Sequence, residues 1–224
     1  MKKLNPVFLD RAQYSKMIDD IEDRHAKGQE MPTKTLHGKK CKITAIKKDN
    51  DFCYISQEDN RVVIVFQGSN DGLDWISNAR FLQGFHGGVH GGMYHSAIKF
   101  REELSAIIAT DPKAARVLCV GHSRGGALAL FLSIFLMKYG VCEKVDLMTF
   151  GSPKVLGSEA REEFNKHNIH YDNVQNRRDY VCRLGTPLFK KVGYIKTLPI
   201  PFWWNFRFIK RHKGYYENIK RLTS

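Results

Sequence analysis

One serine of this chain lies between glycines at the end of an apolar segment. Gly121-His122-Ser123-Arg124-Gly125 follows Arg116-Val117-Leu118-Cys119-Val120 directly and opens a long apolar stretch that ends near Lys138. A buried strand, a tight turn and a helix together hold a serine on a sharp turn with its hydroxyl exposed. The N–H groups and positive dipole of the helix start favour an oxyanion there. The pattern predicts Ser123 as a nucleophile; an ordinary glycine-bearing turn is the alternative.

A serine hydroxyl attacks only after a base removes its proton, so a histidine oriented by a carboxylate is required. Where a strand–turn–helix elbow holds the serine, the acid and then the histidine follow it in the chain. His167, His170 and His212 follow Ser123. Only His212 also leaves room for an acid at the end of a later strand. The chain order therefore favours His212 as the base.

Asp172 and Asp179 are the acids that remain candidates to orient this histidine. Asp146 begins its expected strand, which is the wrong end, and the glutamates fall on turns or solvated helix faces. Asp179 is preferred because it follows an expected strand over 171–176, at the edge where functional groups of α/β sheets collect. We expect the neighbouring Arg177 and Arg178 to keep it ionised. A surface ion pair for Asp179 and a solvated position for His212 are the alternatives.

The segments around these residues alternate between strand and helix patterns. An amphipathic helix over 10–27 and a β-hairpin over 41–57 come first. The alternating elements are expected as strands near 61–66, 116–120, 145–150 and 171–176 and as helices near 94–108, 125–138 and 158–167. This rhythm predicts an α/β fold with a mostly parallel central sheet and helices on both faces.

The composition is that of one soluble domain spanning residues 1–224. With 42% hydrophobic and 26% charged residues, the chain is large enough to bury a sizeable core. The apolar run 127–137 is too short to cross a bilayer, and acidic residues replace the apolar part of an export signal. We therefore expect a cytoplasmic protein. The five cysteines form no metal-binding pattern, so free thiols and no metal are expected.

Positive charge gathers at the C-terminal end of the chain. Twelve basic residues and two acidic ones follow from Arg177 onward, which gives ten of the net thirteen positive charges. The segment 200–209 there mixes five aromatic residues with a base just before His212. Such a mixture suits peripheral contact with an anionic membrane surface, although packing of a late strand into the core is an alternative. No recognition motif for nucleic acid is present, and none is expected as a partner.

Further short motifs occur in a fixed order between Val62 and Tyr216. They are Val63-Ile64-Val65-Phe66-Gln67-Gly68-Ser69, Asp74-Trp75-Ile76, Val89-His90-Gly91-Gly92, the Ser123 pentapeptide with Gly126-Ala127, Thr149-Phe150-Gly151-Ser152-Pro153-Lys154-Val155, Asn176-Arg177-Arg178-Asp179-Tyr180-Val181 and His212-Lys213-Gly214-Tyr215-Tyr216. Together they resemble the class 3 lipase family, which includes fungal triacylglycerol lipases and related phospholipases. Gln67 and Arg124 depart from the family pattern, which has Arg and Leu or Gln there.

The resemblance implies an α/β-hydrolase fold and hydrolysis of lipid esters, as in a triacylglycerol lipase or phospholipase A, without a cofactor. It implies a triad of Ser123, Asp179 and His212. It also implies an oxyanion hole from Ser69 and the backbone N–H of Arg124. A short helical lid over 70–78 would present three apolar side chains, which are Leu73, Trp75 and Ile76. A lipase-like binding or signalling protein without turnover is the alternative function.

Overall fold

A seven-stranded sheet forms the centre of the molecule. The computed structural model describes residues 6–27, 43–49, 51–57, 61–68, 85–86, 88–110, 116–185 and 187–223. The sheet order is β1-β2-β3-β6-β7-β8-β9. These strands are β1 (Ile43–Lys48), β2 (Asp51–Gln57), β3 (Val62–Phe66), β6 (Arg116–His122), β7 (Lys144–Phe150), β8 (His170–Asn176) and β9 (Tyr194–Leu198). A separate short ladder joins β4 (Phe85–His86) to β5 (Val89–His90).

The sheet is mostly parallel, as the sequence predicts. β1 and β2 form the expected antiparallel hairpin, and β2 pairs antiparallel with β3. From β3 through β6, β7 and β8 to β9 every pairing is parallel. All five residues of β3 are buried, because a strand in the middle of such a sheet has helices over both faces.

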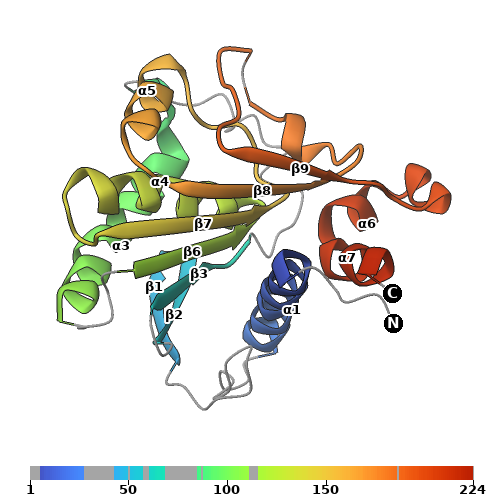
Figure 1. Ribbon diagram of the computed structural model, residues 1–224, viewed down its shortest axis with the longest axis horizontal. Helices are drawn as coiled ribbons and strands as arrows, with labels where there is room; N and C mark the ends of the chain where they lie inside the picture. Colours follow the sequence, from blue (N-terminus) through green and yellow to red (C-terminus); the bar gives the residue numbers. More distant parts are fainter. Residues whose placement is uncertain are drawn as a thin grey trace.

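Helices cover the two faces of the sheet in separate groups (Figure 1). α3, α4 and α5 lie on one face, and α1, α6 and α7 lie on the other. Their bounds are α1 (Pro6–Ala26), α3 (Gly91–Thr110), α4 (Arg124–Lys138), α5 (Ser158–Lys166), α6 (Phe208–Lys213) and α7 (Tyr215–Thr223), with 3₁₀ turns η2 (Val181–Arg183) and η3 (Phe202–Phe206).

The alternation of side chains along the strands divides the interior into two cores. In β3, Ile64 and Phe66 pack toward α3 and α4, and Phe66 meets Phe100 of α3 edge to face with ring centroids 5.3 Å apart. Val63 and Val65 face the other way, toward Tyr14, Ile18 and Ile21 of α1. Successive side chains of a strand point to opposite faces, so one apolar strand supplies both cores.

Several expectations from composition can be compared with the described residues. No helix in the described ranges is long and apolar enough to cross a membrane. Cys53, Cys119, Cys142 and Cys182 carry free thiols, as expected, and Cys41 lies outside the described residues. The organisation as one domain over 1–224 stays a prediction.

Candidate active site

Ser123 occupies the sharp turn between β6 and α4. Its backbone has φ 54° and ψ −124°, a region that L-residues other than glycine rarely adopt and that stores strain. The turn is held by a hydrogen bond from the Ser123 N–H to the Phe150 carbonyl at the end of β7, at 2.9 Å. The serine thus lies at the carboxyl edge of the sheet, in the strand–turn–helix elbow that its sequence predicts.

Glycines beside Ser123 permit this tight path. A β-carbon on Gly121 would lie 2.3 Å from the Gly125 carbonyl oxygen. One on Gly125 would lie 2.5 Å from the Phe66 carbonyl oxygen at the end of β3. Both distances are far below van der Waals contact with rigid backbone, so any side chain at these positions would displace the turn.

His212 and Asp179 meet at the same edge of the sheet, as predicted. Asp179 follows β8 and His212 belongs to α6, and each residue is only 2% exposed. His212 Nδ1 lies 3.0 Å from Asp179 Oδ2. An ionised carboxylate only accepts hydrogen bonds, so Nδ1 carries the proton and Nε2 is left as the basic nitrogen. This tautomer is the one that a general base requires.

Tyr215 and Val181 complete the hydrogen bonding of Asp179. The Tyr215 hydroxyl donates to Oδ2 at 2.6 Å, and the Val181 N–H donates to Oδ1 at 3.0 Å. Burial pulls the pKa of Asp179 upward, but the hydrogen bonds and charge of His212 and the Tyr215 hydroxyl outweigh it and leave the pKa below 3.8. His212 and Tyr215 therefore keep this carboxylate ionised, instead of the expected Arg177 and Arg178, and the Arg178 guanidinium donates to Asn205.

Asn176, the last residue of β8, connects the segments that carry Asp179 and His212. Its Nδ2 donates to the Arg211 carbonyl at 2.8 Å, and its N–H donates to the Tyr215 hydroxyl oxygen at 3.0 Å. Asn176 therefore ties the end of β8 to the helix that presents His212. The sequence reasoning assigned no role to Asn176 or Tyr215, although both lie within the motifs of Asp179 and His212.

His122 is a third side chain that sequence reasoning left without a role. Its ring packs on that of His212 with centroids 4.6 Å apart, and its Nε2 is 2.9 Å from the His212 carbonyl oxygen. Because a carbonyl only accepts, His122 Nε2 carries a proton and donates it to this bond. His122 immediately precedes Ser123, so this contact keeps His212 beside the serine turn.

We expect activity that depends on His212 to persist on the acid side of neutrality. Burial lowers the pKa of His212 below its usual 6.5, more than the hydrogen bond to Asp179 raises it, and the nearby His122 charge lowers it further. The base works only when neutral, so kcat/KM should hold as pH falls to 6.5 and decline only below it, through the lowered pKa. The pH profile of kcat/KM for a short soluble ester measures this.

His170→Gln is the matched control for that profile. His170 is 78% exposed at its side chain and lies near Asp146, far from the serine turn along the sheet. The variant should leave the acid limb in place. An acid limb centred above pH 6.5 in the unmodified protein would contradict the expected direction.

The other candidates are held in separate interactions. Asp172 is buried and accepts from Arg11 of α1, with Arg11 Nη2 2.8 Å from Oδ1. His167, which caps the end of α5, binds Glu163 of that helix, with 3.3 Å between Nε2 and Oε1. Because both side chains have other partners, Asp172 is excluded as the orienting acid and His167 as the base. Four further predicted residues lie outside the described residues, and these are Ser69, Leu73, Trp75 and Ile76.

Arg124 directs its side chain away from the serine turn. Its guanidinium makes two hydrogen bonds to the Asp51 carboxylate at the start of β2, each 2.8 Å, and a third to the Ser96 hydroxyl at 2.7 Å. The Arg124 backbone stays at the first position of α4, where helix N–H groups lack an intrahelical acceptor. A large basic residue after Ser123 is thus compatible with an oxyanion donor from its main chain.

The molecule has a mostly parallel sheet covered by helices, and a buried Asp179–His212 pair beside a strained Ser123. These features place it in the class of α/β hydrolases with a nucleophile elbow. The chain belongs to the class 3 lipase family: the family model described as Lipase (class 3) matches residues 63–189, more than half of its length. That match includes Ser123 and Asp179 and ends before His212, so the position of His212 rests on the geometry above.

Two curated relatives carry names that agree with this family. The chain is 31% identical over 144 residues to phospholipase A1 PLIP2, chloroplastic, of Arabidopsis thaliana, covering 58% of this chain and 20% of that protein. It is 32% identical over 157 residues to secreted mono- and diacylglycerol lipase 1 of Fusarium solani, covering 65% of this chain and 45% of that protein. The chain thus spans less than half of either relative.

The triacylglyceride lipase of Rhizomucor miehei has the same fold. It superposes with a TM-score of 0.73 at 20% identity over 87% of this chain and 81% of the lipase.

Proposed function

We propose that this protein hydrolyses carboxylic esters of lipids through an acyl-enzyme on Ser123. The observation that carries the proposal is the buried hydrogen bond from His212 to Asp179 at 3.0 Å, next to a serine in a strained elbow. Family membership and relatives named as a mono- and diacylglycerol lipase and a phospholipase A1 support it.

In the proposed reaction, His212 Nε2 takes the Ser123 proton while the Oγ attacks the acyl carbonyl. His212 then gives that proton to the leaving alcohol, and the acyl group stays on Ser123. A water molecule, deprotonated by His212, then attacks the acyl carbonyl. The bond between that carbonyl and the Ser123 Oγ breaks, His212 returns the proton to the Oγ, and the acid is released. Asp179 remains ionised throughout and stabilises the imidazolium, a role that its lowered pKa supports.

The oxyanion formed in each half of the reaction needs two donors. We assign these to the backbone N–H of Arg124 and to Ser69, by its N–H and its hydroxyl. The N-terminal end of α4 adds its positive dipole at the same place. The proposed lid with Leu73, Trp75 and Ile76 would cover the acyl group.

The substrate class is tested with mixed liposomes that contain phosphatidylcholine, phosphatidylglycerol and triacylglycerol. We expect fatty acid and the matching lysophospholipid or diacylglycerol to appear with the purified protein, and not with buffer. Mass spectrometry of the products identifies which ester is cut. Absence of every product, together with specific binding of a protein partner, would favour a lipase-like binding protein instead.

We further propose that an exposed aromatic surface beside the triad contacts an anionic membrane. Phe202 and Trp203 of η3 are 76% and 66% exposed, while Trp204 is buried and anchors the turn. The segment Phe202–Phe206 is a 3₁₀ helix, so the alternative of a late strand is wrong, although Trp204 does pack into the interior. Exposed Arg178 and Arg207 flank these rings, and rings with neighbouring cations favour the headgroup region of anionic lipid.

Replacing Phe202 and Trp203 together by alanine should weaken binding to phosphatidylglycerol-containing vesicles by on the order of tenfold, because two apolar rings no longer enter the interface. Co-sedimentation measures the binding. Tyr194→Ala is the control, since Tyr194 is a 64% exposed aromatic at the opposite end of the sheet. Unchanged vesicle binding, or equal loss with Tyr194→Ala, would contradict this surface. Hydrolysis of a short soluble ester should stay the same in every variant.

The proposed enzyme acts in the cytoplasm according to its sequence, and this stays a prediction. The relatives' names include a secreted and a chloroplastic protein.

A further inference from the structure

A cavity lies between α3, α4 and α5, on the helical layer away from the triad. Its volume is about 500 Å³, within the range of small-molecule sites. Its lining on α4 begins at Phe131 and continues to Tyr139, the residue that caps the end of this helix. Phe131 is eight residues beyond Ser123, which places it about 12 Å further along the helix axis. The cavity is therefore separate from the serine turn.

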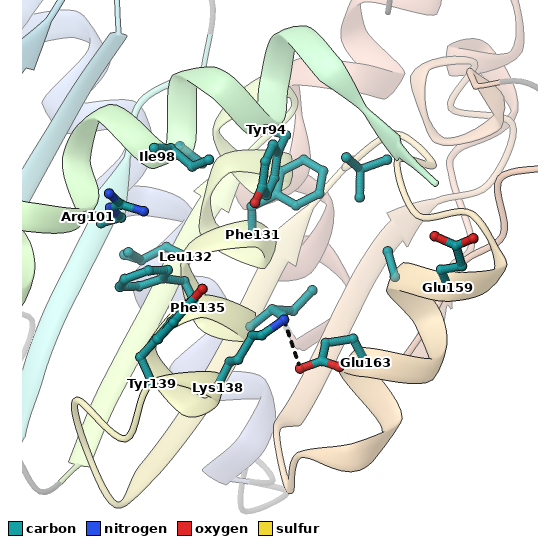
Figure 2. Close-up of a pocket in the computed structure, with 14 residues that line it drawn as sticks. Tyr94, Ile98, Arg101, Phe131, Leu132, Phe135, Lys138, Tyr139, Glu159 and Glu163 are labelled. Carbon is teal, nitrogen blue, oxygen red and sulfur yellow. Dashed lines mark ion pairs between the residues drawn. The ribbon is translucent and has the colours of Figure 1, made fainter. Parts of the chain in front are cut away.

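The lining of this cavity is mainly aromatic and aliphatic (Figure 2). Tyr94 and Phe131 meet edge to face with centroids 5.6 Å apart, and the Phe135 and Tyr139 rings are 4.6 Å apart. Tyr94 is 37% exposed and Tyr139 is 62% exposed. A ligand that covered these rings would remove apolar surface from water, at about 25 cal/mol for each Å² buried. The lining on α4 from Phe131 to Tyr139 spans about 12 Å, which suits an extended chain.

The charged side chains that line the cavity favour a ligand with a single negative charge, bound at one end of the cavity. Lys138 is paired with Glu163 at 3.5 Å. Hydrogen bonds from Lys166 and His167, with the Lys138 charge, hold the pKa of Glu163 below its usual range, so this carboxylate is already well compensated. Arg101 and Glu159 stand at opposite ends of the lining in Figure 2.

Arg101 is the cation most available to a ligand. Its guanidinium lies 5.6 Å from the Phe135 ring centroid, over the aromatic wall. Its carboxylate contact is with Glu102 at 3.5 Å, and the Glu102 side chain is 87% exposed. Such an exposed pair contributes little free energy, whereas a guanidinium binds a ligand carboxylate through two parallel hydrogen bonds.

We propose that this cavity binds a medium-chain fatty acid, with its carboxylate on Arg101 and its alkyl chain along the aromatic wall toward Glu159. Glu159 at the far end repels a second carboxylate, so the site selects a monocarboxylate over a dicarboxylate of equal length. Binding here does not require turnover at Ser123.

The test uses Ser123→Ala protein, so hydrolysis does not enter the result. The fluorescence of dansylundecanoic acid reports binding, and dodecanoic acid, dodecanol and dodecanedioic acid compete with it. We expect dodecanoic acid to displace the probe better than dodecanedioic acid. Arg101→Gln should weaken dodecanoic acid binding about tenfold or more, because the charge-assisted hydrogen bonds to the carboxylate are lost, and should leave dodecanol binding unchanged.

Lys99→Gln is the matched control, because Lys99 is a cation of the same helix that pairs with Asp49 instead of lining the cavity. It should bind as the parent does. Ala160→Trp fills the cavity and should abolish most of the probe signal. If circular dichroism shows that Ala160→Trp does not fold, the comparison of dodecanoic acid binding between Arg101→Gln and Lys99→Gln decides the test. Absence of probe binding, or no effect of Arg101→Gln on dodecanoic acid, would overturn the proposal.

Discussion

Ser123→Ala is expected to lower ester hydrolysis by on the order of 10⁴- to 10⁶-fold, the loss seen when serine hydrolases lose their nucleophile. No other atom at this turn can form the acyl-enzyme, whereas Gly121, His122 and the start of α4 keep their positions. The residual rate would come from the oxyanion donors and substrate binding alone. Steady-state hydrolysis of a short soluble ester measures the loss, and a fluorophosphonate probe should no longer label the protein.

Ser133→Ala is the matched control for this variant. Ser133 is a buried serine of the same helix, and its hydroxyl donates to the Ala129 carbonyl at 2.8 Å. The control should retain labelling and activity within a few-fold. Activity of Ser123→Ala comparable with that of the control would remove Ser123 from the mechanism.

Asp179→Asn should reduce kcat by on the order of 10⁴-fold with the fold retained. The asparagine oxygen, in the place of Oδ1, can still accept from the Val181 N–H, whereas the Tyr215 hydroxyl loses its acceptor at Oδ2. Its amide nitrogen, however, donates to His212 Nδ1, which stabilises the tautomer with the proton on Nε2. That tautomer has no lone pair for the Ser123 proton. Single-turnover kinetics with a chromogenic ester measure the rate of acylation.

The comparison variant is Asp146→Asn. Asp146 is 92% buried and pairs with Arg116 at 3.0 Å, toward the amino end of β7. Both variants remove a buried carboxylate, so thermal unfolding should register a loss of stability in each. Only Asp179→Asn should lose acylation. An equal loss of rate in the two variants would indicate general destabilisation instead of a triad role.

The order of local patterns along the chain was sufficient to predict most of the fold. The continuous apolar residues of β3 indicated a strand covered on both faces, and every residue of that strand is buried. The elbow was predictable because its requirements are local: a strand, small residues around Ser123 and a helix. The candidates Asp179 and His212 followed from chain order, since carboxyl ends of parallel strands share one edge of the sheet.

Neighbours in sequence were a poor guide to the surroundings of Asp179. Arg177 and Arg178 adjoin it, yet Arg178 has φ 62° and its side chain reaches Asn205. The groups that do contact the carboxylate include Tyr215, which is 36 residues away. A turn reverses the chain at these arginines, so adjacent side chains point to different sides.

The sequence alone determined the order of the catalytic groups along the chain: a serine in an elbow, an acid after a later strand and a histidine near the end. Only the tertiary structure decided what holds these groups in place. It brought Asn176, Tyr215 and His122 around the Asp179–His212 pair, turned Arg124 toward Asp51, and opened a cavity between three helices. Each of these depends on contacts between segments far apart in the chain, and pairwise distances of that kind are set by packing, which no local pattern encodes.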